Sequence, residues 1–150
     1  MAANGGFSSD PAYFAAIDSI EGTAPTSYRL LGPYNDLLQI AERRRQFHLL
    51  RNYEQRLLQL YGGIYGDRSP QLAWEWVLLG RKRAARGLLD EGLELVKEAG
   101  ATLKRSLGPE NYLYAQTLTT YSELLSKSGR RDLAATYQKQ ASSTLSGWGF

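Results

Sequence analysis

The sequence predicts an all-α fold in which a short N-terminal helix precedes about three helix hairpins. Apolar residues recur at intervals of three and four, as in Leu50, Tyr53, Leu57, Leu60 and Ile64. This spacing places them on one helix face, whereas a half-buried strand would show alternation. Glycine and proline gather at a few places along the chain and divide it into segments of helix length. Landmark residues also recur at a fixed interval, which indicates a repeat architecture.

The first expected element is a short helix in DPAYFAAIDSIEG, residues 10–22. Asp10 is the expected N-cap, Pro11 suits the first helical position, and Gly22 follows the helix end. The stretch from Thr23 to Gly32 is expected to be a loop with little structure of its own.

A 42-residue period places the remaining helices. Gly66 and Gly108 each end one helix shortly before the next begins, and Gly87 and Gly129 each lie in the turn of a hairpin. Each pair is 42 residues apart, and the same step back places Arg45 in the first turn. The expected helix pairs are 34–44 with 46–65, 70–86 with 88–107, and 111–128 with 130–146.

The second pair resembles a tetratricopeptide repeat. The signature of that family begins with tryptophan, leucine and glycine at spacings of three and one, which Trp76, Leu79 and Gly80 match. The later signature positions of this repeat are Gly87, Gly92 and Ala99. The matching positions of the third repeat are Leu118, Tyr121, Ser122, Gly129, Ala134 and Ala141. Those of the first are Tyr34, Leu37, Leu38, Arg45, Leu50 and Leu57. The period, and a Leu-Gly-Pro sequence between repeats, resemble the long variant typified by kinesin light chains.

The resemblance implies a right-handed superhelical stack of antiparallel hairpins over residues 28–146. Its repeats would span 28–66, 67–108 and 109–146, between an N-terminal segment (1–27) and a tail (147–150). Small residues are needed where paired helices approach closely, and Gly80, Gly92, Ser122, Ala134 and Ala141 supply them. Glycine inside a helix costs about 1 kcal/mol relative to alanine, so Gly80 and Gly92 indicate a steric requirement. The first repeat lacks such residues.

Composition limits the function classes. The chain has 150 residues, 43% of them apolar, and a net charge of +3, which describes a mildly basic globular protein. Without cysteine it has no disulfide, thiolate metal site or cysteine nucleophile. No apolar run is long enough to span a bilayer, and MAANGGFSSD lacks the features of a secretory signal. A cytoplasmic location is favoured, with a periplasmic or exported mature form as the alternative.

No enzyme chemistry is expected. The single histidine, His48, has no visible partners for a metal site or a triad, and YGGIYGD lacks the lysine and hydroxyl of a phosphate loop. Acidic residues cluster early in one helix, where they favour the helix dipole and form a solvated face: Asp90, Glu91, Glu94 and Glu98. We therefore predict no catalytic residue, cofactor or metal.

The family resemblance also implies a binding surface. In tetratricopeptide arrays the first helices of successive repeats line a concave groove that usually binds peptides. The corresponding residues are Asn35, Gln39, Arg43, Trp74, Val77, Arg81, Lys82, Gln116, Thr119 and Glu123. Trp76 occupies a packing position of the family, whereas Trp74 does not and could anchor a ligand. The lysine and asparagine set of chaperone-tail-binding relatives is not reproduced, so that ligand is not predicted.

Two functions follow from these patterns. The first is a non-catalytic scaffold or adaptor that binds a protein or peptide segment, with an acidic segment as one candidate. The second is a basic helical domain that binds nucleic acid, the less favoured partner, or an acidic regulatory partner. Its residues would be Arg43, Arg44, Arg45, Arg81, Lys82, Arg83 and Arg86. Cations near helix C-termini also have a simpler explanation in the helix dipole.

The end of the third repeat leaves an apolar face to be covered. Either the tail with Trp148 and Phe150 folds back, or this face contacts a second subunit or further sequence.

Overall fold

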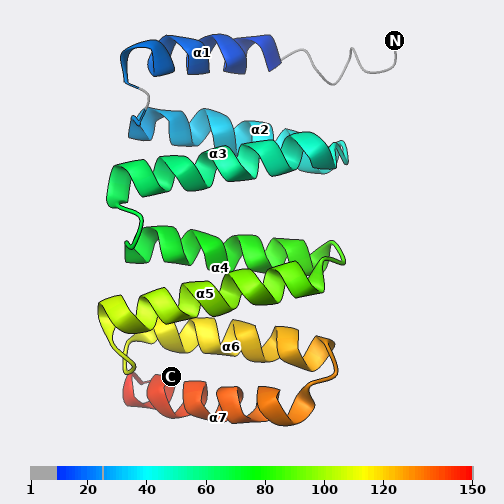
Figure 1. The fold of residues 1–150 in the computed structure, drawn as a ribbon, viewed down its shortest axis with the longest axis vertical. Coiled ribbons are helices and arrows are strands. Elements are labelled where there is room, and N and C mark those ends of the chain that lie inside the picture. The colour runs from blue at the N-terminus through cyan, green and yellow to red at the C-terminus, as the bar shows by residue number, and fades with distance from the viewer. Residues whose placement is uncertain (1–9, 25, 150) are drawn as a thin grey trace. The chain divides into compact units, whose positions relative to one another are not determined.

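The computed structural model describes residues 10–24 and 26–149. In this part of the chain no strand occurs, and the helical elements are α1 (Asp10–Thr23), η1 (Tyr28–Leu30), α2 (Leu31–Arg43), α3 (Phe47–Tyr65), α4 (Pro70–Ala85), α5 (Leu89–Leu107), α6 (Tyr112–Lys127) and α7 (Arg131–Gly147) (Figure 1). The predicted all-α class is confirmed. The chain divides into two compact units, Met1–Asp67 and Arg68–Phe150. The N-terminal helix therefore groups with the first hairpin, and the other two hairpins form the second unit.

The backbone follows the predicted period. Gly87 and Gly129 lie in the α4–α5 and α6–α7 turns with φ of +90° and +87°, and Arg45 lies in the α2–α3 turn with φ of +54°. Gly66 and Gly108 end α3 and α5 with φ of +101° and +90°. Glycine adopts this left-handed conformation without a Cβ clash, whereas Arg45 does so at a cost. The bounds of the six predicted hairpin helices differ from the observed ones by at most three residues.

The segment predicted to be a loop is partly helical. Ser27 accepts a hydrogen bond at its side-chain oxygen from the Arg29 backbone N–H (3.1 Å), and η1 follows at once. α2 then begins at Leu31 rather than Tyr34, because Pro33 is tolerated in the first turn of a helix. α1 begins at Asp10 and continues one residue past Gly22. The side chain of Asp10, and with it the predicted N-cap, lies outside the described part of the structure.

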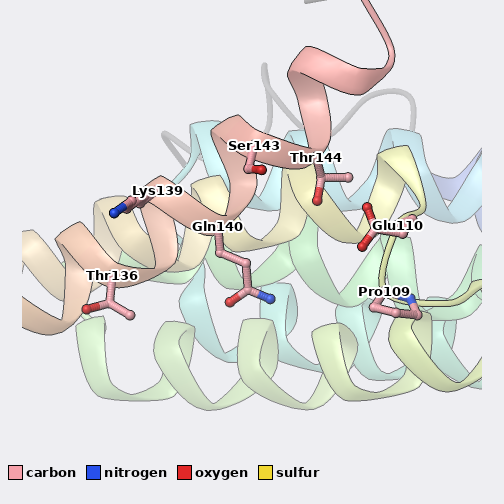
Figure 2. Close-up of a pocket in the computed structure, with 7 residues that line it drawn as sticks. All are labelled: Pro109, Glu110, Thr136, Lys139, Gln140, Ser143 and Thr144. Carbon is pink, nitrogen blue, oxygen red and sulfur yellow. The ribbon is translucent and has the colours of Figure 1, made fainter.

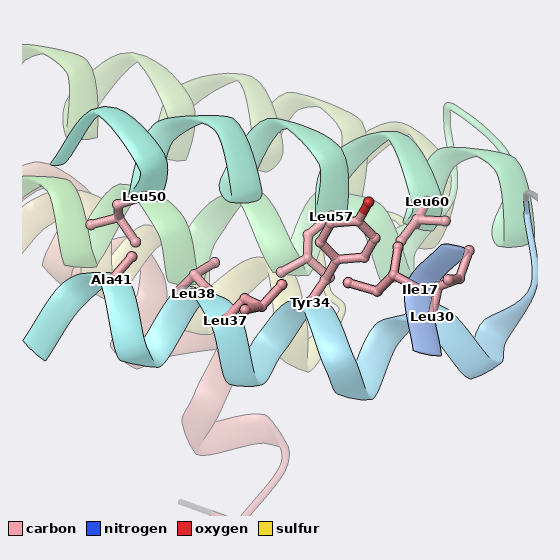
Figure 3. Packing of buried hydrophobic residues seen from close by; sticks show 9 residues of the cluster. All are labelled: Ile17, Leu30, Tyr34, Leu37, Leu38, Ala41, Leu50, Leu57 and Leu60. Carbon is pink, nitrogen blue, oxygen red and sulfur yellow. The ribbon is translucent and has the colours of Figure 1, made fainter. Parts of the chain in front are cut away.

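The core of the first unit joins α1 to the first hairpin (Figure 3). Its buried residues are Ile17 of α1, Leu30 of η1, Tyr34, Leu37, Leu38 and Ala41 of α2, and Leu50, Leu57 and Leu60 of α3. Glu21 adds a hydrogen-bond network, which we call the polar tie: its Oε1 accepts hydrogen bonds from the Tyr34 hydroxyl (2.8 Å) and from Arg56 Nη2 (2.9 Å). One carboxylate of α1 therefore contacts both α2 and α3.

This polar tie favours the ionised form of Glu21. Burial by itself would raise the pKa of the Glu21 carboxyl, but hydrogen bonds from Arg56 and Tyr34, together with the charge of Arg56, hold the pKa below its ordinary value of 4.5. Burial and the hydrogen bond to Glu21 raise the pKa of the Tyr34 hydroxyl. At neutral pH the network therefore joins a carboxylate, a guanidinium and a neutral phenol.

The second unit shows why glycine occurs inside its helices. A Cβ on Gly92 would lie 2.5 Å from the carbonyl oxygen of Gly80, and a Cβ on Gly80 would lie 2.6 Å from Cγ2 of Val96. α4 and α5 therefore pack backbone against backbone, as the sequence predicted. In the α6–α7 hairpin the equivalent residues are Ser122 and Ala134, both buried. The buried residues of the larger core cluster in this unit are Ala73, Val77, Ala99, Leu103, Tyr114, Leu118 and Ala141.

Candidate functional site

The predicted groove residues of the first unit lie on α2. Asn35, Gln39 and Arg43 are exposed and four residues apart, so they share one stripe of the helix. The Asn35 side-chain amide donates a hydrogen bond to the Leu31 carbonyl oxygen (2.9 Å). These residues form a polar stripe on the outside of the first unit.

The predicted residues of α4 differ in exposure. Arg81 and Lys82 are exposed and Trp74 is half-buried, but Val77 is 0% exposed. The prediction that Val77 faces a ligand is therefore wrong. Val77 lies one helical turn after buried Ala73 and shares its inward face, so it packs in the core.

The predicted residues of α6 form one stripe. Gln116 and Thr119 are half-buried and Glu123 is exposed. The Gln116 Nε2 donates a hydrogen bond to the Tyr112 hydroxyl oxygen, and Thr119 Oγ1 donates to the Ala115 carbonyl oxygen (3.3 Å). Two of the three polar side chains are therefore held by their own helix.

α4 and α6 contact each other within the second unit. The 42-residue period makes Trp74 equivalent to Gln116 and Arg81 equivalent to Glu123. Trp74 and Arg81 are two turns apart on α4, which separates them by about 10 Å along the helix axis. We give the name α4–α6 surface to the six predicted residues that these two helices carry outside the core, and their forming one binding surface stays a prediction: Trp74, Arg81, Lys82, Gln116, Thr119 and Glu123.

Trp74 has a packing role that its position in the sequence did not indicate. Its side chain packs against the core of the second unit, as that of Trp76 does, and is only partly buried. The Trp76 indole nitrogen is buried without a hydrogen-bond partner. Both side chains therefore pack against the core and are partly exposed, and they differ in that the indole nitrogen of Trp76 is buried.

The basic residues of α4 do not form one continuous surface. Arg83 lines a shallow cleft of about 430 Å³ whose other residues are Asp90, Glu91, Glu94, Leu95 and Glu98. Asp90 and Glu91 belong to the first turn of α5, as predicted. Because Arg83 lies among carboxylates while Arg81 and Lys82 are exposed, the cationic run is divided between two environments.

A second shallow cleft was not anticipated from the sequence. It measures about 400 Å³, and Figure 2 shows its lining residues: Pro109 and Glu110 of the α5–α6 loop, and Thr136, Lys139, Gln140, Ser143 and Thr144 of α7. Nearby, the Trp148 indole N–H donates a hydrogen bond to the Glu110 carbonyl oxygen (2.8 Å). Trp148, the C-cap of α7, thus contacts the α5–α6 loop, whereas coverage of the last apolar face by the tail stays a prediction, and Phe150 lies outside the described residues. The cleft joins polar residues far apart in sequence, so no local pattern marks it.

Other site classes find no support in the part of the chain that the structure describes. His48 is exposed on the first turn of α3. Across residues 10–24 and 26–149, no three histidine or acidic side chains gather closely enough to hold a metal ion. None of the helices in these ranges combines the length and apolarity needed to cross a membrane.

Comparison with known proteins supports the fold. No protein-family model and no curated protein matches the sequence. Among solved structures, the chain is similar to BtubC (BKLC) from P. vanneervenii, a kinesin light chain-like protein, with a TM-score of 0.72 and 17% sequence identity. The match covers 91% of this chain and 55% of that one, so the chain spans about half the length of BtubC. The chain therefore has a tetratricopeptide-like helical-repeat fold.

Proposed function

We propose that this protein is a non-catalytic scaffold or adaptor that binds a peptide or protein segment on the α4–α6 surface. The fold supports this proposal in general terms, because stacked hairpins present the first helices of neighbouring repeats side by side. The observation that carries it is the half-buried ring of Trp74, which packs against the core and remains accessible on the same helix as Arg81 and Lys82.

Trp74 has the properties of an interface anchor. Tryptophan is enriched among the residues that dominate binding energy, and an anchor works best when its conformation is fixed before binding. The packing of Trp74 against the core supplies that fixation. We expect loss of its ring to weaken binding by at least 2 kcal/mol, or about thirtyfold.

The charged residues would orient the ligand. Arg81 and Glu123 occupy equivalent positions of adjacent repeats with opposite charges, and Lys82 adds a second cation beside Arg81. Exposed charges of this kind contribute more to orientation and association rate than to affinity. A bound segment would place apolar atoms near Trp74 and an acidic group near Arg81.

A nucleic-acid-binding function is less well supported. Arg83 lies among carboxylates, and Arg44 and Arg86 are half-buried, so four of the seven basic residues are exposed, and these are divided between the two units: Arg43 and Arg45 in the first, Arg81 and Lys82 in the second. Phosphate binding needs several such charges together and weakens steeply with salt.

The test begins with selection of peptides from a random display library on the full chain. The affinity of selected peptides is then measured by calorimetry for the wild-type chain and for three variants: Trp74→Ala, Gln116→Ala and the double charge reversal Arg81→Glu with Lys82→Glu. Leu133→Ala is the matched control, because this exposed apolar residue of α7 lies outside the α4–α6 surface.

We expect Trp74→Ala to weaken binding about thirtyfold, whereas Leu133→Ala leaves it unchanged. Charge reversal should weaken binding of acidic peptides, with only a modest effect of added salt. Equal affinity of the selected peptides for the wild-type, Trp74→Ala and Gln116→Ala chains would refute the proposed site. Binding that falls steeply with salt and ignores peptide sequence would favour the polyanion function instead.

A further inference from the structure

Trp148 joins the end of α7 to the beginning of α6. Its indole N–H donates a hydrogen bond to the Glu110 carbonyl oxygen (2.8 Å), and its ring meets the Tyr112 ring edge-on with 6.5 Å between centroids. Trp148 is 57% exposed, so the core contributes little to its placement. These two contacts therefore fix the side chain against the α5–α6 loop and the first residue of α6.

Tyr112 carries this contact to the α4–α6 surface. Its hydroxyl oxygen accepts a hydrogen bond from Gln116 Nε2, one turn further along the same stripe of α6. The bond uses one of the two amide N–H groups of Gln116, which leaves the other N–H and the amide oxygen for a ligand. A continuous series of contacts thus runs from Trp148 through Tyr112 to Gln116.

We propose that Trp148 is a positioning residue for the α4–α6 surface: it fixes the Tyr112 ring, whose hydroxyl orients the Gln116 amide toward a bound peptide backbone. The inference rests on the proposed function and adds a residue outside the surface itself. Without Trp148, Tyr112 and Gln116 regain rotamer freedom that a peptide must then remove. Immobilising one further side chain weakens binding about two- to tenfold.

A double-mutant cycle on the full chain tests whether Trp148 affects peptide binding through Gln116. Calorimetry with a display-selected peptide compares the wild type, Trp148→Ala, Gln116→Ala and the double variant. We expect Trp148→Ala to weaken binding about two- to tenfold in the wild-type background and to have no further effect when Gln116 is already alanine. Tyr112→Phe removes the accepting hydroxyl and keeps the ring, so it should reproduce the loss. Leu133→Ala again controls for a change on α7.

A second measurement needs no peptide. The Gln116 side-chain amide resonances, assigned by their loss in Gln116→Ala, should shift in both Trp148→Ala and Tyr112→Phe. If Trp148→Ala does not fold, as judged by circular dichroism, Trp148→Phe removes the indole N–H and should shift the same resonances.

The inference is overturned if the Gln116 resonances do not shift in Trp148→Ala or in Tyr112→Phe. It is also overturned if Trp148→Ala weakens binding equally in the wild-type and Gln116→Ala backgrounds, or if Trp148→Ala tightens binding. The last result would make Trp148 an obstacle to the ligand. Failure of the proposed function looks different, because Trp74→Ala and Gln116→Ala would then bind peptide as tightly as the wild type. If selection yields no peptide, the resonances still decide whether Trp148 positions Gln116.

Discussion

Gly92 allows the sharpest test of the packing in the second unit. Substitution by alanine places a Cβ 2.5 Å from the Gly80 carbonyl oxygen and 3.1 Å from the Ala84 Cβ. The first neighbour is a backbone atom of α4, so no side-chain rotation relieves the contact. α4 and α5 must therefore move apart, which loosens the packing along their whole interface.

Two opposing effects set the magnitude. Alanine favours a helix interior by about 1 kcal/mol over glycine, whereas overpacking a close contact costs about 1–3 kcal/mol. A backbone neighbour places Gly92→Ala near the upper end of that cost, so we expect a net loss of about 1–2 kcal/mol. Gly100 of the same helix is the matched control: its Cβ would meet Thr117 Cγ2 at 3.5 Å, an ordinary contact. Only the propensity gain remains there, and Gly100→Ala should stabilise by up to about 1 kcal/mol.

Urea denaturation followed by tryptophan fluorescence measures both variants. All three tryptophans, Trp74, Trp76 and Trp148, belong to the second unit, so their emission reports this unit alone. The expected difference in unfolding free energy between the two variants is about 1–3 kcal/mol. Equal stabilities, or a Gly92→Ala chain more stable than the wild type, would show that the two helices do not approach as closely as described.

Three further outcomes are expected. Arg45→Gly should stabilise the chain by up to about 1 kcal/mol in thermal unfolding followed by circular dichroism, because glycine removes the cost of positive φ; a loss would contradict the assigned turn conformation. The Glu21–Arg56 tie holds the pKa of Glu21 below its ordinary value, so its stabilising contribution is present above about pH 4.5 and is lost as pH falls through the lowered pKa. The protection factors of α1 against hydrogen exchange, which are corrected for the intrinsic pH dependence of exchange, should therefore fall more on acidification in the wild type than in Glu21→Gln. Equal pH profiles of the two chains would show that Glu21 has no such role. Val77→Ala deletes two buried methyl groups and should cost about 1–2 kcal/mol by tryptophan-monitored denaturation, and a neutral result would mean that Val77 is not in the core.

The repeat period made most of the fold predictable. Turn and cap glycines 42 residues apart located the helix ends, and the period placed Arg45 in a turn where no glycine marked it. The repeat period did not predict the structure of the segment before Tyr34. A single proline, Pro33, is compatible with both a loop and a helix start, and the choice between them depends on the burial of Leu30.

The candidate site was predicted only in part. Residue spacing identified the helices that carry the candidate site. It did not identify which face of α4 each residue occupies, and three residues along this helix separate half-buried Trp74 from fully buried Val77. The contact between Trp148 and Glu110 spans 38 residues and rests on a backbone carbonyl, which has no sequence signature. Contacts of this kind become visible only in three dimensions.

The equivalent positions of α2, α4 and α6 hold Gln39, Arg81 and Glu123, which are neutral, positive and negative, and all three lie outside the buried cores. Core packing and exposed charge thus vary independently in this chain. A designer can rewrite the charge order along the repeats by exchanging one exposed side chain in each, with the glycines and leucines that specify the fold left unchanged. The chain is in this respect a modular template, in which three substitutions change its charge pattern and none needs to touch its architecture.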